Sequence, residues 1–156
     1  MVRCDEQGHP VSEWSTLVQP DRDPGPTTVH GLTADHLAAA PRFTDVLPEL
    51  LRQVEGSVVT AHNLAFDAAF LSAECQRAGH HGPSGFGLCT LTLARSLYPR
   101  REGYSLATCT AAAGIEQREA HRALADAQAT ALLLDRMLAH VPVGRHRWMR
   151  RRLRLG

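Results

Sequence analysis

The pattern of apolar and polar residues changes its period near the middle of the chain. Val58-Val59-Thr60-Ala61 is a short run rich in β-branched residues, which favours a buried strand. Asn63 predicts the start of a helix directly after it, because its side chain can accept from an unpaired backbone N–H. Apolar residues then recur at helical spacing and predict one buried face, made of Phe66, Ala69, Phe70 and Ala73. Gly79 predicts the end of this helix.

Similar signals predict elements before and after this strand–helix unit. Residues 2–18 predict two strands joined by a turn at Asp5-Glu6-Gln7-Gly8, and residues 20–26 predict a loop. Three further helices are predicted from their N-cap residues, which are Thr33, Thr44 and Ser105. Their ends are predicted at Pro41, Gly56 and Gly114.

The second half of the chain predicts one more strand and two more helices. The Gly/Pro-rich residues 79–87 predict a loop, followed by a short strand at Leu88-Cys89 and a helix over residues 91–97. The last helix is predicted from Arg122 to Ala139, with Leu124, Ala127, Ala131, Leu134 and Leu138 on one side. Strands followed by mixed strands and helices predict a single α/β domain with a mixed sheet.

Composition restricts the class of protein. The 156 residues suffice for one domain with a core, and no apolar run approaches the ~20 residues of a membrane span. The N-terminus shows no apolar segment of a signal peptide, so we expect a cytoplasmic protein without membrane contact. The four cysteines form no Cys-x-x-Cys pair, which predicts free thiols and no zinc site.

Charge is distributed unevenly along the chain. The formal net charge is +1, and residues 1–144 carry 11 Arg against 16 acids. Residues 145–156 carry six Arg and no acid. We therefore expect an acidic domain over residues 1–142 and a basic tail over residues 143–156. An acidic domain suits metal binding, whereas a basic tail is either a solvated end or a contact for phosphate backbones.

Two helices are each predicted to carry an Asp near their start, with a His just before it. These pairs are His62 with Asp67, and His121 with Asp126. Each Asp alone is explained by the helix dipole. Together, two carboxylates and an imidazole suit a divalent metal with oxygen ligands beside a titratable base.

The segments His62-Asn63-x-x-Phe66-Asp67-x-x-Phe70-Leu71 and His121-Arg122-Ala123-Leu124-x-Asp126-Ala127 resemble two motifs of the DnaQ-like (DEDDh) 3′–5′ exonucleases. That family includes the epsilon subunit of DNA polymerase III. The resemblance extends over roughly residues 2–140. It includes further segments around Ser15–Pro20, Val29–Thr33, Thr90–Arg95 and Tyr104–Leu106.

The resemblance implies an RNase H-like fold and hydrolysis by two metal ions, Mg²⁺ or Mn²⁺. Asp67 and Asp126 would ligate metal, and His121 would be the general base that activates water. Asn63, Phe66 and His62 would shape the groove for the terminal nucleotides, with Phe66 also expected in the core. The implied substrate is a single-stranded 3′ end, with DNA favoured over RNA, and a DNA polymerase subunit is an implied partner.

The chain departs from the family pattern at the first motif. An Asp-x-Glu-Thr on a first strand supplies two of the family's four carboxylates, and this sequence begins after it. Asp5-Glu6 cannot replace that pair, because they occupy a turn far from the sheet edge. Two carboxylates do not suffice for two hard cations, so we expect impaired catalysis. The family's first strand is central to its sheet, and without it we expect unpaired strand edges.

Several alternatives remain open at this stage. A start codon placed too far downstream, a decayed gene, or another chain that fills the gap would each explain the missing strand. The protein could also be an inactive RNase H-like module that binds nucleic acid through its Arg-rich tail, in which Trp148 could stack on a base. A third possibility is an interaction subunit with no nucleic-acid role.

Overall fold

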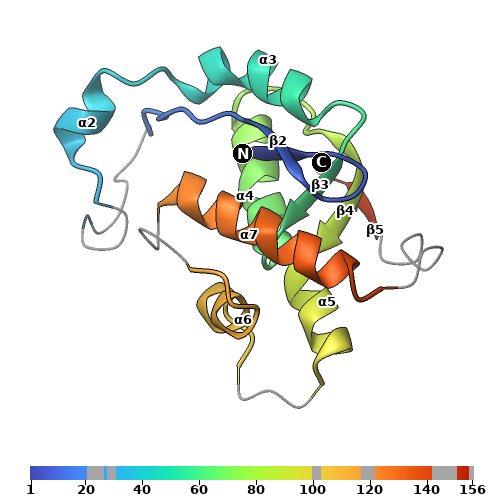
Figure 1. The fold of residues 1–156 in the computed structure, drawn as a ribbon. Helices are drawn as coiled ribbons and strands as arrows, with labels where there is room; N and C mark the ends of the chain where they lie inside the picture. The colour runs from blue at the N-terminus through green and yellow to red at the C-terminus, as the bar shows by residue number, and fades with distance from the viewer. Residues whose placement is uncertain (21–26, 28–30, 100–102, 117–121, 142–150, 155–156) are drawn as a thin grey trace.

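The computed structural model describes residues 1–20, 27, 31–99, 103–116, 122–141 and 151–154 (Figure 1). The elements are β1 (Val2–Cys4), β2 (Pro10–Glu13), α2 (Ala34–Ala38), α3 (Phe43–Val54), β3 (Val58–Ala61), α4 (Leu64–Arg77), β4 (Ser84–Cys89), α5 (Thr90–Leu97), α6 (Leu106–Ala112), α7 (Ala123–Leu138) and β5 (Arg151–Arg154). The α/β class predicted from the sequence is confirmed. Within these described residues, no helix is long and apolar enough to cross a membrane.

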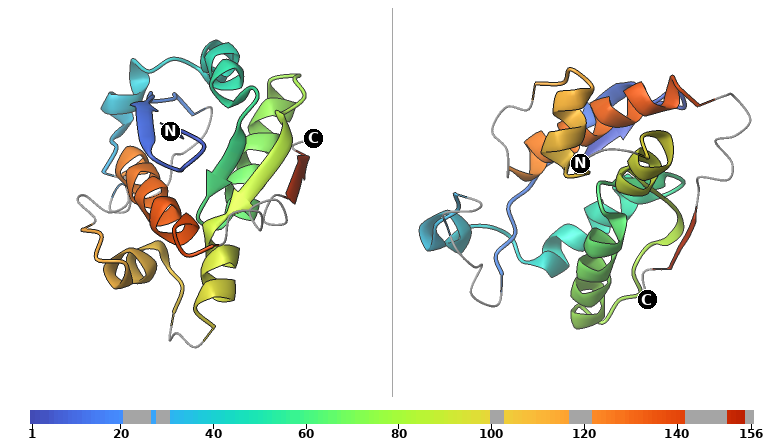
Figure 2. Two further views of the ribbon diagram at one scale, coloured as in Figure 1. Left: turned by 45° about the vertical axis from the view of Figure 1, so that its right-hand side comes forward. Right: turned by 90° about the horizontal axis from the view of Figure 1, so that it is seen from below.

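The strands form two separate sheets. β1 pairs antiparallel with β2, and β3, β4 and β5 form a second sheet in that order. Figure 2 shows the β1–β2 hairpin and the three-stranded sheet standing apart. Among the described strands, β1 and β3 each pair on one side only. The absence of a central strand, expected from the sequence, stays a prediction. Between the sheets, the Arg3 guanidinium donates to the Ser57 hydroxyl at 3.3 Å.

The parallel pair β3–β4 places two helix starts at one edge of the sheet. The register runs from Val58 opposite Phe86 to Ala61 opposite Cys89, so both strands end together. The crossover helix α4 packs against both of them. The predicted loop over residues 79–87 is wrong in its second half, because β4 begins at Ser84. Pairing on both sides, to β3 and to β5, holds this Gly-rich segment extended despite its weak strand propensity.

Part of the basic tail joins this sheet. Residues 151–154 form β5, which pairs antiparallel with β4, with Arg151 opposite Gly87 and Arg154 opposite Ser84. The pairing satisfies backbone groups along β4 that would otherwise form an open edge. The division into a domain over residues 1–142 and a basic tail over residues 143–156 stays a prediction, and the described part of the tail, residues 151–154, pairs with β4.

Two of the three predicted N-caps are confirmed. The hydroxyls of Thr33 and Ser105 each accept from the backbone N–H three residues further on, at 3.3 and 3.1 Å. The prediction at Thr44 is wrong, because α3 begins one residue earlier and is capped at Arg42. The Asp45 carboxylate accepts from the Arg42 backbone N–H at 3.0 Å, so the helix start is fixed from inside its first turn.

The core lies where β4, α5, α6 and α7 meet. Its buried members are Leu88, Leu93, Ala94, Cys109, Leu133, Met137 and Val141. The predicted apolar side of α7 is correct in part: Ala131 is buried and Leu134 packs against the core, but the most buried large residues, Leu133 and Met137, were not predicted. α7 is apolar around most of its circumference, so periodicity alone does not fix which face is buried.

The predicted apolar face of α4 is wrong. The side chains of Phe66 and Phe70 are 69% and 54% exposed, whereas Leu64 and Cys75 are buried. Within the described residues, α4 packs mainly against β3 and β4, and the side that carries Phe66 is turned away from this contact. Phe66 consequently is not part of the core.

Candidate active site

The turn between β3 and α4 is built by an unusual backbone conformation. Asn63 is the only non-glycine residue with positive φ among the described residues, at φ 72° and ψ 51°. Asn adopts this left-handed conformation more readily than most residues. Asn63 is the N-cap position, as predicted, but its side chain does not cap the helix. Its amide is therefore available to a ligand.

The thiol of Cys89 ties the end of β4 to the starts of α4 and α5. Burial alone would raise the pKa of this thiol. Hydrogen bonds from the side chain and backbone of Thr92, and from the backbone N–H groups of Leu64 and Asn63, outweigh burial and lower the pKa. The groups that lower this pKa belong to the N-termini of two helices, α4 and α5.

His62 joins three separate segments. Its Nε2 lies 2.7 Å from the carbonyl oxygen of Tyr104, and its Nδ1 lies 3.0 Å from the hydroxyl of Thr90. A carbonyl only accepts, so Nε2 carries the proton. The Thr90 hydroxyl also donates to the Ala61 carbonyl oxygen at 3.5 Å. Both nitrogens are therefore occupied by protein groups. This arrangement suits a residue that supports the groove more than one that contacts substrate.

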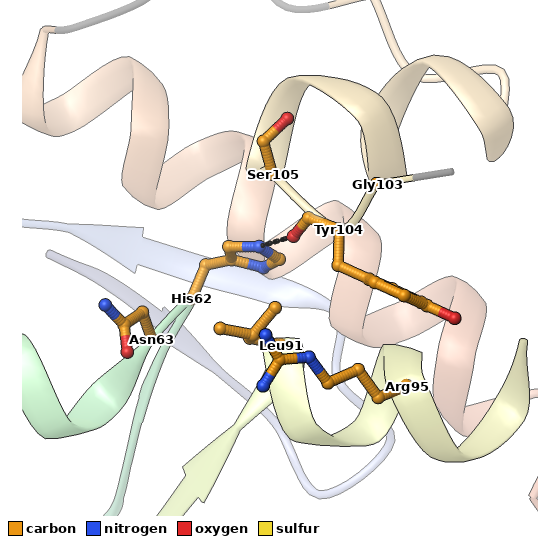
Figure 3. A pocket seen from close by; sticks show the side chains of 7 residues that line it. All are labelled: His62, Asn63, Leu91, Arg95, Gly103, Tyr104 and Ser105. Atoms are coloured by element: carbon orange, nitrogen blue, oxygen red, sulfur yellow. Dashed lines mark hydrogen bonds between the residues drawn. The ribbon is translucent and has the colours of Figure 1, made fainter. Parts of the chain in front are cut away.

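A pocket of about 490 Å³ opens beside His62 (Figure 3). It is lined by His62, Asn63, Leu91, Arg95, Gly103, Tyr104 and Ser105. The guanidinium of Arg95 lies over the Tyr104 ring, 5.9 Å from its centroid. Neither Arg95 nor Tyr104 is among the site residues predicted from the sequence. Their segments are 9 positions apart in sequence, and only the fold shows that they share a wall with Asn63.

Asp67 lies in the first turn of α4, as predicted. Its side chain is largely exposed, yet partial desolvation raises its pKa above the ordinary value, while its own backbone N–H acts in the opposite direction. A carboxyl with a raised pKa is one whose charge the protein does not balance. A bound cation would balance it.

Asp126 lies in the first turn of α7 and is half-buried. Its backbone N–H donates to the Arg122 carbonyl at 2.9 Å, which marks the helix start, and its own carbonyl accepts from the Thr130 hydroxyl at 2.8 Å. His121, the predicted general base, lies outside the described residues. Within the residues that are described, no three His, Cys, Asp or Glu side chains gather as a metal site would require. The convergence of Asp67, Asp126 and His121 therefore stays a prediction.

A second, smaller hollow of about 210 Å³ lies between the hairpin, α3 and the start of α7. Its walls include Trp14, Val46 and Leu124. Leu124 precedes Asp126 by two residues, so this mainly apolar hollow adjoins the first turn of α7.

The architecture is that of the RNase H-like exonucleases. A solved structure of exonuclease X in complex with 5′-overhanging duplex DNA aligns with a TM-score of 0.70 and 30% sequence identity. That alignment covers 89% of this chain and 80% of the other. A full-length 3′-exonuclease aligns with a TM-score of 0.73 over 86% of this chain and 67% of its own, and at 16% identity it supports the fold alone.

The chain belongs to the exonuclease family, whose family model, RNase_T, matches residues 1–134. It is 32% identical over 134 residues to the DNA polymerase III subunit epsilon of Treponema pallidum, across 83% of this chain and 62% of that protein. It is also 32% identical over 133 residues to the PolC-type DNA polymerase III of Oceanobacillus iheyensis, across 84% of this chain and 9% of that protein. The chain thus spans less than two thirds of the length of these curated relatives.

Proposed function

We propose that this chain is a DnaQ-type 3′–5′ exonuclease domain that removes nucleotides from a single-stranded 3′ end, with DNA favoured over RNA. The observation that carries the proposal is family membership over residues 1–134, together with Asp67 and Asp126, each in the first turn of its helix. One relative is the epsilon subunit of DNA polymerase III and another is a PolC-type DNA polymerase III, which supports a polymerase subunit as partner.

The proposed chemistry depends on divalent cations, Mg²⁺ or Mn²⁺. Asp67 and Asp126 offer the hard oxygen ligands that these ions prefer, and the raised pKa of Asp67 is consistent with a carboxylate that lacks a counter-charge. However, two carboxylates are too few to ligate two divalent cations. The described residues add no third ligand beside them. We therefore propose that the chain as given binds metal weakly and is impaired in hydrolysis.

Three further side chains would activate the attacking water and bind the substrate. His121 would take the proton from the attacking water, because an imidazole titrates near neutral pH. Asn63 has a side-chain amide free of capping, and Phe66 has an exposed ring. Both suit contacts to a terminal nucleotide, the amide by hydrogen bonding and the ring by stacking.

The test is degradation of a 5′-labelled single-stranded oligonucleotide in Mg²⁺ or Mn²⁺, where a ladder of shortened products reports removal from the 3′ end. We expect slow, metal-dependent shortening that disappears in Asp67→Ala and in His121→Ala. Fast degradation that depends on Asp67 would contradict the proposed impairment. No shortening under any condition would contradict the hydrolytic function.

A fusion protein tests whether slow hydrolysis is caused by the lack of a second carboxylate pair or by the absence of any nuclease function. An Asp-x-Glu-Thr strand fused before Met1 supplies the carboxylates that the proposal calls missing. We expect the fusion to raise the rate by orders of magnitude, and a matched Asn-x-Gln-Thr fusion to leave it unchanged. Equal rates for the two fusions would refute a role for added carboxylates.

A second candidate function is nucleic-acid binding without cleavage, favoured by the placement of Arg-rich β5 at the edge of the main sheet. Salt-dependent oligonucleotide binding that is lost when Arg151, Arg152 and Arg154 are changed to Gln would support it. Substitution is preferable to truncation, because it leaves the backbone pairing with β4 possible.

A further inference from the structure

Arg95 lacks the ion pair that two other helical arginines form within the described residues. Arg52 and Arg77 each pair with a glutamate three residues earlier on the same helix. Arg95 has Thr92 at that position, and residues 75–101 contain no acidic residue. Among the described residues, its guanidinium forms no ion pair, and it lies over the Tyr104 ring, 5.9 Å from the ring centroid. Within the part of the chain that the structure describes, Arg95 is therefore a positive charge without an acidic partner in the wall of a pocket.

The remaining residues of this pocket suit a ligand that carries an anionic group next to an apolar group. The Asn63 amide can donate, whereas the His62 nitrogens and the Ser105 hydroxyl are already engaged by protein groups. Leu91 and the Tyr104 ring supply apolar surface, and the Tyr104 hydroxyl donates to the Tyr98 carbonyl at 2.5 Å, which fixes the ring. The pocket, of about 490 Å³, falls in the ordinary range for small-ligand sites.

The pocket is close to the proposed reaction site. Asn63 lines it, and Asp67 follows Asn63 by four residues, so the two lie about one helical turn apart along α4. A planar guanidinium binds phosphate oxygens through two parallel hydrogen bonds, which a free amide can supplement.

We propose that the pocket between α5 and the segment 103–105 binds a phosphodiester of the nucleic-acid strand next to the bond that is cut, with Arg95 as its charge partner and Asn63 as a second donor. The inference rests on the proposed function, since it places the pocket along the path of the same strand. Arg95 is a substrate-binding residue in this proposal and takes no part in bond cleavage.

The experiment measures fluorescence anisotropy of a labelled single-stranded thymidine oligonucleotide with the full chain in EDTA, over a series of salt concentrations. We expect Arg95→Gln to weaken binding about tenfold and to reduce the slope of log K against log salt by about 0.7, the loss of one phosphate contact. Arg77→Gln is the matched control, because it removes the same charge from an exposed helix position outside the pocket. Thermal unfolding of both variants checks that each is folded.

Equal binding by the two variants would contradict phosphodiester binding in the pocket, while leaving the proposed nuclease function untouched. Binding that depends on Arg95 without any shortening of the 5′-labelled oligonucleotide in metal would support the pocket and refute the hydrolytic function. Thymidine monophosphate and inorganic phosphate are tested as competitors. If either binds through Arg95 while the oligonucleotide does not, the ligand is a free phosphate compound and the proposal fails.

Discussion

The ring of His62 donates from Nε2 to the carbonyl oxygen of Tyr104 across 2.7 Å, although the two residues are 42 positions apart. The contact joins the end of β3 to the segment that leads into α6. The Nδ1 atom of the same ring contacts the hydroxyl of the fully buried Thr90. The His62 side chain therefore joins three segments and helps to fix their relative positions. The walls of the pocket at Arg95 depend on that position.

We expect His62→Ala to destabilise the protein by about 1–3 kcal/mol, because it leaves partly buried hydrogen-bonding groups without their partner. Urea denaturation measures the change. His140→Ala is the control, since His140 bonds only to the carbonyl of its own helix, four residues earlier. A loss no larger than that of the control would show that the three segments hold together without the imidazole.

Features of this protein that depend on residues close together in sequence could be predicted from the sequence. The caps at Thr33 and Ser105 follow from a hydroxyl and a backbone N–H three residues apart, and both are present. The exonuclease family also follows from spaced motifs, and the family match confirms it. Asp67 and Asp126 are in the first turns where the motifs predicted them.

Features that depend on distant segments could not be predicted in this way. Phe66 on α4 is exposed although it belongs to the apolar face that the helical period predicts, because burial depends on which distant segments pack against the helix. The strand at residues 84–87 is stabilised by pairing with β5, whose residues lie more than 60 positions away. The pocket at Arg95 requires α5 and the segment before α6 to be brought together by His62.

The observed burial of α7 is tested by two adjacent leucines. Leu133 is 2% exposed within the core cluster, whereas Leu132 is 43% exposed. We expect Leu133→Ala to cost about 2–5 kcal/mol through lost burial and a cavity, and Leu132→Ala to change stability by less than about 0.5 kcal/mol. Chemical denaturation of the pair measures both. Similar losses at the two positions would mean that the helix is rotated from the face described.

The cluster at Glu49 predicts an acid-dependent loss of stability. Hydrogen bonds from Arg52 and Gln53 lower the pKa of Glu49 from 4.5 to about 2. Because the folded pKa is depressed, the contribution is present above pH 4.5 and is lost as the pH falls toward 2. We expect Glu49→Gln to be less stable than the parent at neutral pH and to match it near pH 2. Chemical denaturation of both proteins over this pH range measures the difference.

Asp67 predicts the opposite dependence, because desolvation raises its pKa in the folded state. A carboxyl with a raised folded pKa binds its proton more tightly in the native protein, so its ionised form opposes folding and stability falls as the pH rises above 3.8. In EDTA, we expect Asp67→Asn to be more stable than the parent at neutral pH. The difference should shrink as the pH falls through the folded pKa and vanish below 3.8.

Added Mg²⁺ distinguishes a metal ligand from a carboxyl that is merely desolvated. If Asp67 ligates the cation, Mg²⁺ will raise the thermal unfolding temperature of the parent and leave Asp67→Asn unchanged, since a ligand bound only by the native state stabilises it. Asp35→Asn, an exposed first-turn acid of α2, should respond as the parent does. An equal response to Mg²⁺ in the parent and in Asp67→Asn would remove Asp67 from the proposed metal site, because the carboxylate would then contribute nothing to cation binding.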